Sequence, residues 1–190
     1  MKFCSQCGNN IEHKIPEGDN RLRFVCLSCE TIHYQNPNIV VGTIPVYGDK
    51  ILLCKRAIEP RYGYWTLPAG FMENKETTAE GALRETWEEA EAVVEIDSLF
   101  SMINVPQIDQ VHIFFLARLL EPKYAAGSES LKVELFSEEE IPWEEIAFPT
   151  VKKTLQLFLE DRKKGAFETH VTDIIRSQRN PLLKEHNEHN

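Results

Sequence analysis

Four of the five cysteines stand in two Cys-x-x-Cys pairs close to the N-terminus, and this spacing constrains the fold more than any other feature. The pairs are Cys4 with Cys7 and Cys26 with Cys29. Two thiolates at this spacing can both reach one ion about 2.3 Å away, and a second pair completes a tetrahedron. Such a site has no open position for chemistry. We therefore predict a structural Zn²⁺ in a zinc ribbon at residues 1–35, with a redox pair or unrelated thiols as the alternatives.

Charge and hydropathy exclude several classes of partner. The 190 residues carry a formal net charge of −9, and the ribbon region is neutral, with four basic and four acidic residues. This charge argues against a nucleic-acid or acidic-membrane partner held by bulk electrostatics. No apolar run approaches the ~20 residues of a membrane span, and the N-terminus shows no signal or transit pattern. We expect a cytoplasmic protein with no nucleic-acid or membrane partner.

After the ribbon, strand and helix patterns alternate, which predicts a mixed α/β class. A turn-rich linker occupies 34–38. We expect strands at 39–46, 50–55, 93–96, 111–119 and 131–136, a short acidic turn or helix at 137–142, and helices at 77–90 and 150–164. Residues 165–190 are expected to form a polar tail.

The helix at 77–90 carries the chemistry. Thr77 and Glu80 form a capping-box pattern at its start. Positions at three- and four-residue steps predict one apolar face against a sheet: Ala79, Ala82, Leu83, Thr86, Trp87 and Ala90. The other face gathers three carboxylates beside one guanidinium: Glu85, Glu88, Glu89 and Arg84.

Two observations favour a metal site over a merely solvated acidic face. Residues 73–95 hold eight glutamates against two basic residues, which is −6 of the total −9. The Pro68-Ala69-Gly70 turn before the helix suits a close approach of backbone to a ligand. Mg²⁺ prefers oxygen ligands and commonly lies between carboxylates and a substrate phosphate. We therefore predict a metal-binding face.

The pattern Gly70-x5-Glu76-x7-Arg84-Glu85-Thr86-x-Glu88-Glu89 resembles the Nudix box, the metal-binding loop and helix of Nudix hydrolases. Together with the ribbon, the chain resembles one branch of that family, which includes the bacterial NADH pyrophosphatase type and the plant plastid FAD pyrophosphatase type. The resemblance to the FAD type runs through nearly the whole chain. It implies a Nudix α/β/α sandwich with a mixed sheet at 36–165, after the ribbon and before a polar tail at 166–190, and a homodimer.

Three positions depart from the family pattern. Glu91 and Glu30 stand where glycine is usual, at places expected to take a positive φ. At position 91 this costs roughly 1 kcal/mol of helix-end stability. Thr86 replaces an aliphatic residue, so we expect a mild loss of packing.

The resemblance also implies roles. Glu85, Glu88 and Glu89, with the backbone carbonyl of Gly70, would hold one to three Mg²⁺ or Mn²⁺ ions that neutralise a pyrophosphate and activate a water. Arg84 would orient a box carboxylate through a bidentate pair. The general base varies across the family, and four candidates stay open: Glu85, Glu89, Glu129 and Glu134.

The implied reaction is cleavage of the pyrophosphate bond of a small nucleotide substrate, an ADP-linked dinucleotide. The proline-rich array of the NADH type is missing from 101–107, the upstream motif of the coenzyme A type is absent, and Pro106 lies where ADP-ribose pyrophosphatases carry a proline. We rank FAD, cleaved to FMN and AMP, first, ADP-ribose second and NADH third. A non-catalytic nucleotide sensor and a nucleic-acid adaptor are the alternatives of other classes. The full set of box carboxylates argues against a non-catalytic sensor, and the neutral charge of the ribbon argues against a nucleic-acid adaptor.

Overall fold

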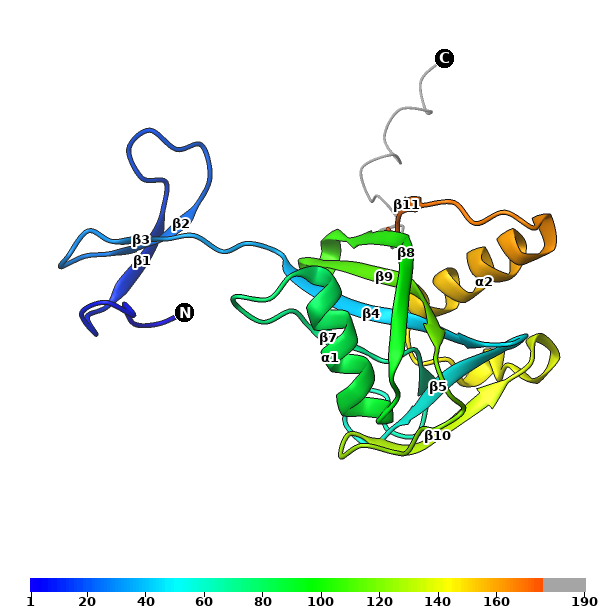
Figure 1. The fold of residues 1–190 in the computed structure, drawn as a ribbon. Coiled ribbons are helices and arrows are strands. Elements are labelled where there is room, and N and C mark those ends of the chain that lie inside the picture. Colours follow the sequence, from blue (N-terminus) through cyan, green and yellow to red (C-terminus); the bar gives the residue numbers. More distant parts are fainter. Residues whose placement is uncertain (176–190) are drawn as a thin grey trace, which may run out of the picture. The chain divides into compact units, whose positions relative to one another are not determined.

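The computed structural model describes residues 1–175, and these fall into two compact units that divide after Pro37 (Figure 1). The first unit is a three-stranded antiparallel sheet with β2 in the middle. Its strands are β1 (Ile11–Lys14), β2 (Arg23–Cys26) and β3 (Ile32–His33). The residue after each Cys-x-x-Cys turn has a positive φ, 74° at Gly8 and 59° at Glu30. The expectation that a glutamate takes this glycine-favouring conformation is confirmed.

The second unit is built on an eight-stranded mixed sheet. Its strands are β4 (Asn38–Tyr47), β5 (Lys50–Arg56), β6 (Trp65–Thr66), β7 (Ala69–Phe71), β8 (Val94–Val105), β9 (Gln110–Leu119), β10 (Ser130–Phe136) and β11 (His170–Asp173). The helices are α1 (Thr78–Ala90), α2 (Pro149–Lys164) and the 3₁₀ turns η1 (Pro106–Ile108), η2 (Glu138–Glu140) and η3 (Trp143–Glu145). The strand order is β10-β5-β4-β9-β8-β11, with β6 on β5 and β7 on β4. The β4–β9 and β8–β11 pairs are parallel, and the others are antiparallel.

The two long helices cover opposite faces of this sheet. Successive side chains of a strand point to opposite faces. On β4, Ile44 belongs to the apolar cluster that contains Leu155 and Phe158 of α2, whereas Val41 packs with Ala82 of α1. Figure 1 shows the two helices on different sides of the sheet. The predicted α/β/α sandwich with a mixed sheet is confirmed.

Helix α1 begins and ends as its sequence predicts. The Thr77 hydroxyl accepts a hydrogen bond from the Glu80 backbone N–H at 3.2 Å, and the Glu80 carboxylate accepts from the Thr77 N–H at 2.7 Å. The helix ends at Glu91, which takes the left-handed conformation with φ 47°. Gly81 lets α1 lie close to the sheet, because a Cβ at this position would press on the Glu76 carboxylate and on Val41.

The prediction of which α1 residues face the sheet is partly wrong. Leu83 and Trp87 are 37% and 53% exposed, whereas Glu89 is buried. Glu89 turns inward because the Ala69 backbone N–H donates to its carboxylate at 3.2 Å. Thr86 is also buried, and its hydroxyl lies 2.6 Å from that of Thr43 on β4. The threonine therefore replaces the expected aliphatic packing with a hydrogen bond between helix and sheet.

Two strand predictions also need correction. β8 runs to Val105 rather than ending near residue 96. The sequence pattern predicted a shorter strand because two irregularities in the pairing of β8 with β9 disrupt the side-chain alternation. β11 lies within the expected polar tail and pairs with β8. The buried carboxylate of Asp161 on α2 holds His170 of β11, with Oδ2 2.7 Å from Nε2. The remainder of the predicted tail, 176–190, lies outside the described residues. Within residues 1–175 no helix is both long and apolar enough to cross a membrane.

Candidate active site

The site begins where β7 meets α1. The backbone of Gly70 lies so close to the Glu85 carboxylate that a Cβ at position 70 would overlap it. Glycine is required here for space, since its φ is not positive. Glu85 is half-buried, and this burial raises the pKa of its carboxyl group despite the neighbouring Arg84. The structure thus brings together two of the predicted metal-binding residues.

Glu89 is the most deeply buried carboxylate of the site, with 6% of its surface exposed. Burial raises its pKa to about 8, and the negative charges of Glu85 and Glu129 act in the same direction. The Ala69 N–H and the positive charge of Arg56 oppose this shift. A buried acid with such a pKa is largely protonated at neutral pH until a cation binds beside it.

Arg84 joins most of the remaining acidic side chains. Its Nε and Nη2 donate to the two carboxylate oxygens of Glu76 at 3.0 and 2.8 Å, which is a bidentate pair. Its Nη1 donates to Glu85 at 2.7 Å and to the exposed Glu88 at 3.1 Å. These bonds lower the pKa of Glu76 to about 2. Arg84 therefore holds the like charges of Glu85 and Glu88 together on one turn of α1, and it also binds Glu76 in the segment before the helix.

The three predicted ligand carboxylates share one helix surface but do not surround a single point. Among residues 1–175, the four cysteines are the only group of three or more His, Cys, Asp or Glu residues whose candidate ligand atoms all lie within 4.8 Å of one another. Glu88 is engaged with Arg84, and Glu89 with the Ala69 N–H. The donor set fits Mg²⁺ or Mn²⁺ in its chemistry, and each of these two carboxylates uses only one oxygen in these hydrogen bonds, so its second oxygen can bind an ion.

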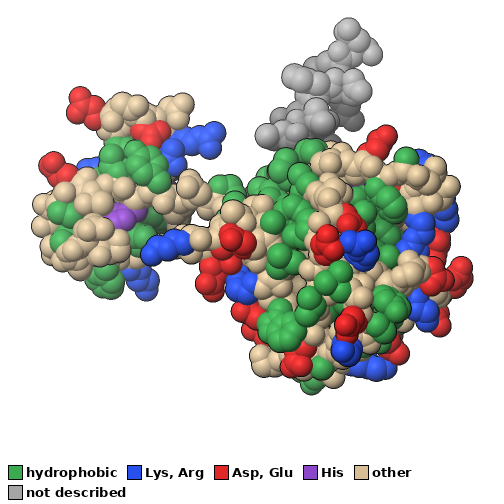
Figure 2. Space-filling view, viewed as in Figure 1, with side chains coloured by type: hydrophobic (Ala, Val, Ile, Leu, Met, Phe, Trp, Pro, Cys, Tyr) green, Lys and Arg blue, Asp and Glu red, His purple; other side chains and the backbone are tan. Residues whose placement is uncertain are grey.

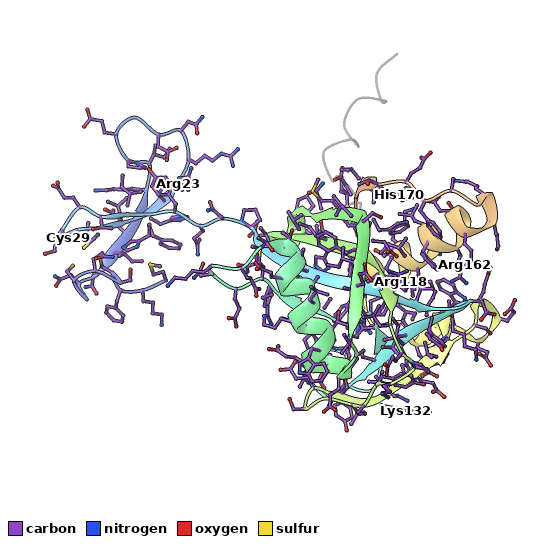
Figure 3. All side chains as sticks on the ribbon, viewed as in Figure 1. Arg23, Cys29, Arg118, Lys132, Arg162 and His170 are labelled. Carbon is purple, nitrogen blue, oxygen red and sulfur yellow. The ribbon has the colours of Figure 1, made fainter. Side chains whose placement is uncertain are left out.

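The two loop candidates for the general base are placed differently. The loop that carries Glu129 is hydrogen-bonded to the end of α1, because the Gly127 N–H donates to the Glu89 carbonyl, and the negative charge of Glu129 raises the pKa of Glu85 and of Glu89. Glu134 points elsewhere on β10, where its carboxylate pairs with Lys132 at 2.8 Å. Figure 3 labels Lys132 on this edge strand. The geometry favours Glu129 over Glu134.

Arg56 is a site residue that the sequence analysis missed. It is the last residue of β5 and is only 9% exposed. Its Nε donates to the Pro60 carbonyl at 2.9 Å, and its guanidinium lies 5.0 Å from the centre of the Phe148 ring. Within residues 1–175 its two terminal nitrogens have no protein hydrogen-bond partner, although its charge acts on Glu89. The available signal was a basic residue that ends an apolar strand shortly before the box.

The pKa of Glu89 predicts that metal binding releases a proton. Because an ion needs the carboxylate form, Mn²⁺ affinity should fall as the pH drops below about 8, by up to roughly tenfold per unit. Isothermal titration in buffers of different ionisation enthalpy measures both affinity and proton release. Without metal, the same raised pKa of Glu89 makes the folded protein less stable as the pH rises. The folded pKa exceeds the unfolded value of about 4.3, so the stabilisation is full below that value and is lost as the pH rises through 8. A pH-independent Mn²⁺ affinity between pH 6.5 and 8.5 would contradict the assignment.

The four cysteines of the first unit fit a tetrahedral Zn²⁺ site. The Sγ atoms of Cys4 and Cys29 are 3.7 Å apart, and those of Cys7 and Cys26 are 3.4 Å apart. A tetrahedron with Zn–S bonds of about 2.3 Å has edges of about 3.8 Å. His33 Nε2 lies 3.3 Å from the Cys4 sulfur, where it can donate to a thiolate. Cys29, labelled in Figure 3, has its pKa lowered to about 6, mainly by the Thr31 hydroxyl.

We expect removal of zinc to unfold the ribbon and leave the α1 site chemically intact, because the ribbon has little core of its own. Cys7→Ser should reduce bound zinc from one ion per chain, as measured by atomic absorption, and should lower the melting temperature. Cys54→Ala is the matched control, since Cys54 is a buried cysteine of β5 and is not a member of the four-cysteine group. If a zinc chelator at constant Mg²⁺ changes neither melting nor oligomeric state, the four-cysteine site has no structural role.

Comparisons with known proteins agree on the same two segments. A family model described as Nudix N-terminal, a zinc ribbon, matches residues 2–35, and the NUDIX domain model matches residues 36–158. A crystal structure of a NUDIX hydrolase from Nitrosomonas europaea has a TM-score of 0.90 and 52% identity, and the match covers 93% of this chain and 100% of that one.

Two curated proteins illustrate the range of similar sequences. ADP-ribose pyrophosphatase from Methanocaldococcus jannaschii is 31% identical over 113 residues, which are 57% of this chain and 67% of that protein. The NAD-capped RNA hydrolase NudC from Vibrio atlanticus is 34% identical over 93 residues, which are 47% of this chain and 31% of that protein. The match therefore spans under a third of the NudC length.

Proposed function

Since the chain belongs to the Nudix hydrolase family, as its sequence predicted, we propose that it hydrolyses the pyrophosphate bond of an ADP-linked dinucleotide with a divalent cation. One observation carries this proposal. The Gly70 backbone contacts the Glu85 carboxylate where β7 packs against the second half of α1, and the buried Glu89 accepts a hydrogen bond from the adjacent Ala69 N–H. The buried guanidinium of Arg56 acts on Glu89 through its charge, and its two terminal nitrogens have no protein partner within residues 1–175. Cation ligands and an anion-binding group are thereby neighbours, which is the arrangement that a pyrophosphate needs.

Each site residue has a separate role in this proposal. Glu85, Glu88 and Glu89 would hold Mg²⁺ or Mn²⁺, with the Gly70 carbonyl as a further oxygen ligand. A bound ion neutralises phosphate oxygens and lowers the pKa of a water. Arg84 fixes the ligand carboxylates, and Arg56 donates to a phosphate oxygen in a bidentate or single bond. The candidate acceptors for the proton of the attacking water are Glu85, Glu89 and Glu129.

ADP-ribose, NADH and FAD all contain ADP linked through its pyrophosphate to a second group, and this common part defines the proposed substrate class. ADP-ribose and NADH are the substrate types that similar proteins suggest, since their names mention ADP-ribose and NAD. FAD is the substrate favoured by the sequence resemblance, and its cleavage yields FMN and AMP. We keep FAD first and ADP-ribose second. Loss of the proline-rich array at 101–107 places NADH third.

A free dinucleotide is a better substrate than a capped RNA for this chain. The net charge is −9, and a nucleic acid bound through its phosphates needs a basic surface. On the visible face in Figure 2, Lys and Arg side chains of the second unit are interspersed with Asp and Glu. A nucleotide sensor without catalysis is the alternative of another class, and the complete carboxylate set disfavours it.

Incubation of the purified protein with Mg²⁺ and FAD, ADP-ribose or NADH, followed by chromatography of the products, tests the proposal. We expect AMP together with FMN, ribose 5-phosphate or reduced nicotinamide mononucleotide, and no product when EDTA replaces Mg²⁺. Binding of all three compounds without cleavage would favour the sensor. Sedimentation of the same sample tests the proposed homodimer.

A further inference from the structure

The loop between β9 and β10, residues 120–129, is attached to the C-terminal end of α1. The last carbonyl groups of a helix lack partners within the helix. Here the Ala125 backbone N–H donates to the Ala90 carbonyl at 2.9 Å, and the Gly127 N–H donates to the Glu89 carbonyl at 3.2 Å. The loop thus binds the turn of the helix that carries Glu88 and Glu89.

Gly127 is the point of closest approach. A Cβ at this position would overlap the carbonyl oxygen of Glu88 and press on the backbone of Glu89. The φ of Gly127 is not positive, so the requirement for glycine comes from lack of space and not from the backbone conformation. Any side chain at this position must push the loop away from α1 or shift the end of the helix.

The same loop fixes Glu129. The Gly127 carbonyl accepts a hydrogen bond from the Ser130 N–H at 3.1 Å, which closes a tight turn around residues 128 and 129. The Glu129 carbonyl accepts from the Ala57 N–H at 2.8 Å, directly after Arg56. The chain is therefore held on both sides of Glu129, between α1 and the end of β5. The charge of Glu129 acts on Glu85 and Glu89.

We propose that Gly127 is a positioning residue, whose contact with the last turn of α1 sets the distance between Glu129 and the α1 carboxylates. These acidic groups come from segments 40 to 44 residues apart in the sequence, and the loop holds them in one arrangement. The role of Glu129 rests on the proposed function. The contact between loop and helix does not, because it is given by backbone hydrogen bonds and close packing.

Kinetics of Gly127→Ala in the full-length protein test this role. With the best substrate of the wild type, we expect kcat to fall about 10²-fold, with KM changed less than about threefold. Mn²⁺ binding without substrate, followed by electron paramagnetic resonance, should weaken. If Gly127 acts through Glu129, the double variant Gly127→Ala/Glu129→Gln should be no slower than Glu129→Gln alone.

Two insertions keep the test independent of folding defects. One glycine inserted after Ser128 leaves Gly127 on α1 but displaces Glu129, so kcat should fall as in Gly127→Ala. One glycine inserted between Glu121 and Pro122 lengthens the same loop before its attachment, where both residues are exposed. This control should retain kcat within about twofold.

Wild-type kcat and Mn²⁺ affinity in a folded Gly127→Ala protein would overturn the proposal, as would additive losses in the double variant. If the wild type cleaves none of the three dinucleotides, the proposed function fails separately. Mn²⁺ binding then still tests the contact between loop and helix, since it should weaken in Gly127→Ala and stay unchanged in the control insertion.

Discussion

Replacement of Glu89 by glutamine is expected to lower kcat by at least about 10²-fold without unfolding the protein. Glutamine has the same shape, and its side-chain oxygen can still accept the hydrogen bond from the Ala69 N–H. The free energy of unfolding should change little without metal, because the pKa of about 8 means that Glu89 is already mostly neutral at pH 7. What is lost is a negative ligand for the cation. Steady-state kinetics at saturating Mg²⁺ and urea unfolding measure the two effects.

Glu134→Gln is the matched control for this experiment. Glu134 is a glutamate of the same second unit, but its carboxylate pairs with Lys132 on an edge strand. We expect its kcat to stay within about twofold of the wild type, since a surface ion pair contributes little. Near-normal turnover of Glu89→Gln, or an equal loss in Glu134→Gln, would remove the role assigned to Glu89.

The sequence predicted those parts of the molecule in which local patterns determine the structure. The capping box at Thr77 and Glu80, the strained helix end at Glu91 and the four-cysteine cluster all depend on residues at short, fixed spacing. The mixed sheet followed from the succession of strand and helix patterns. In the first two cases the chemistry of a few neighbouring residues favours one arrangement, and the four cysteines add two short motifs that can share one ion.

The parts that the sequence did not predict depend on contacts between distant segments. Trp87 has the apolarity of a core residue, yet it is exposed because Glu89 and Thr86 take the inward positions, bound to Ala69 and Thr43. A periodicity argument counts a glutamate as polar and cannot foresee that a backbone N–H from β7 will hold it inside. β11 was missed for a related reason, since a four-residue strand is stabilised by its pairing with β8 and not by its own pattern.

Arg56 was not assigned from the sequence, because its approach to the acidic groups depends on contacts between distant segments, and its replacement gives the second large effect. Arg56→Met should raise KM about 10- to 10²-fold, because a charge-assisted hydrogen bond to phosphate is worth about 1.5–3 kcal/mol. Methionine keeps part of the apolar packing against Phe148. The positive charge of Arg56 lowers the pKa of Glu89. Its removal should therefore raise that pKa and move the pH dependence of Mn²⁺ binding to higher pH.

Arg162→Met controls for the loss of a stacked arginine as such. The Arg162 guanidinium lies 4.6 Å from the centre of the Phe158 ring, and its Nη1 donates to the Asp49 carbonyl at 2.8 Å. It projects from α2, as labelled in Figure 3, and α2 covers the face of the sheet opposite α1. A similar loss of stability in both variants with a KM increase only in Arg56→Met would assign Arg56 to phosphate binding. The KM of Arg56→Lys should fall between those of the wild type and Arg56→Met, since lysine keeps the charge and loses the planar pair of donors. Equal KM values in the wild type and Arg56→Met would show that the free donors of this buried guanidinium do not meet the substrate.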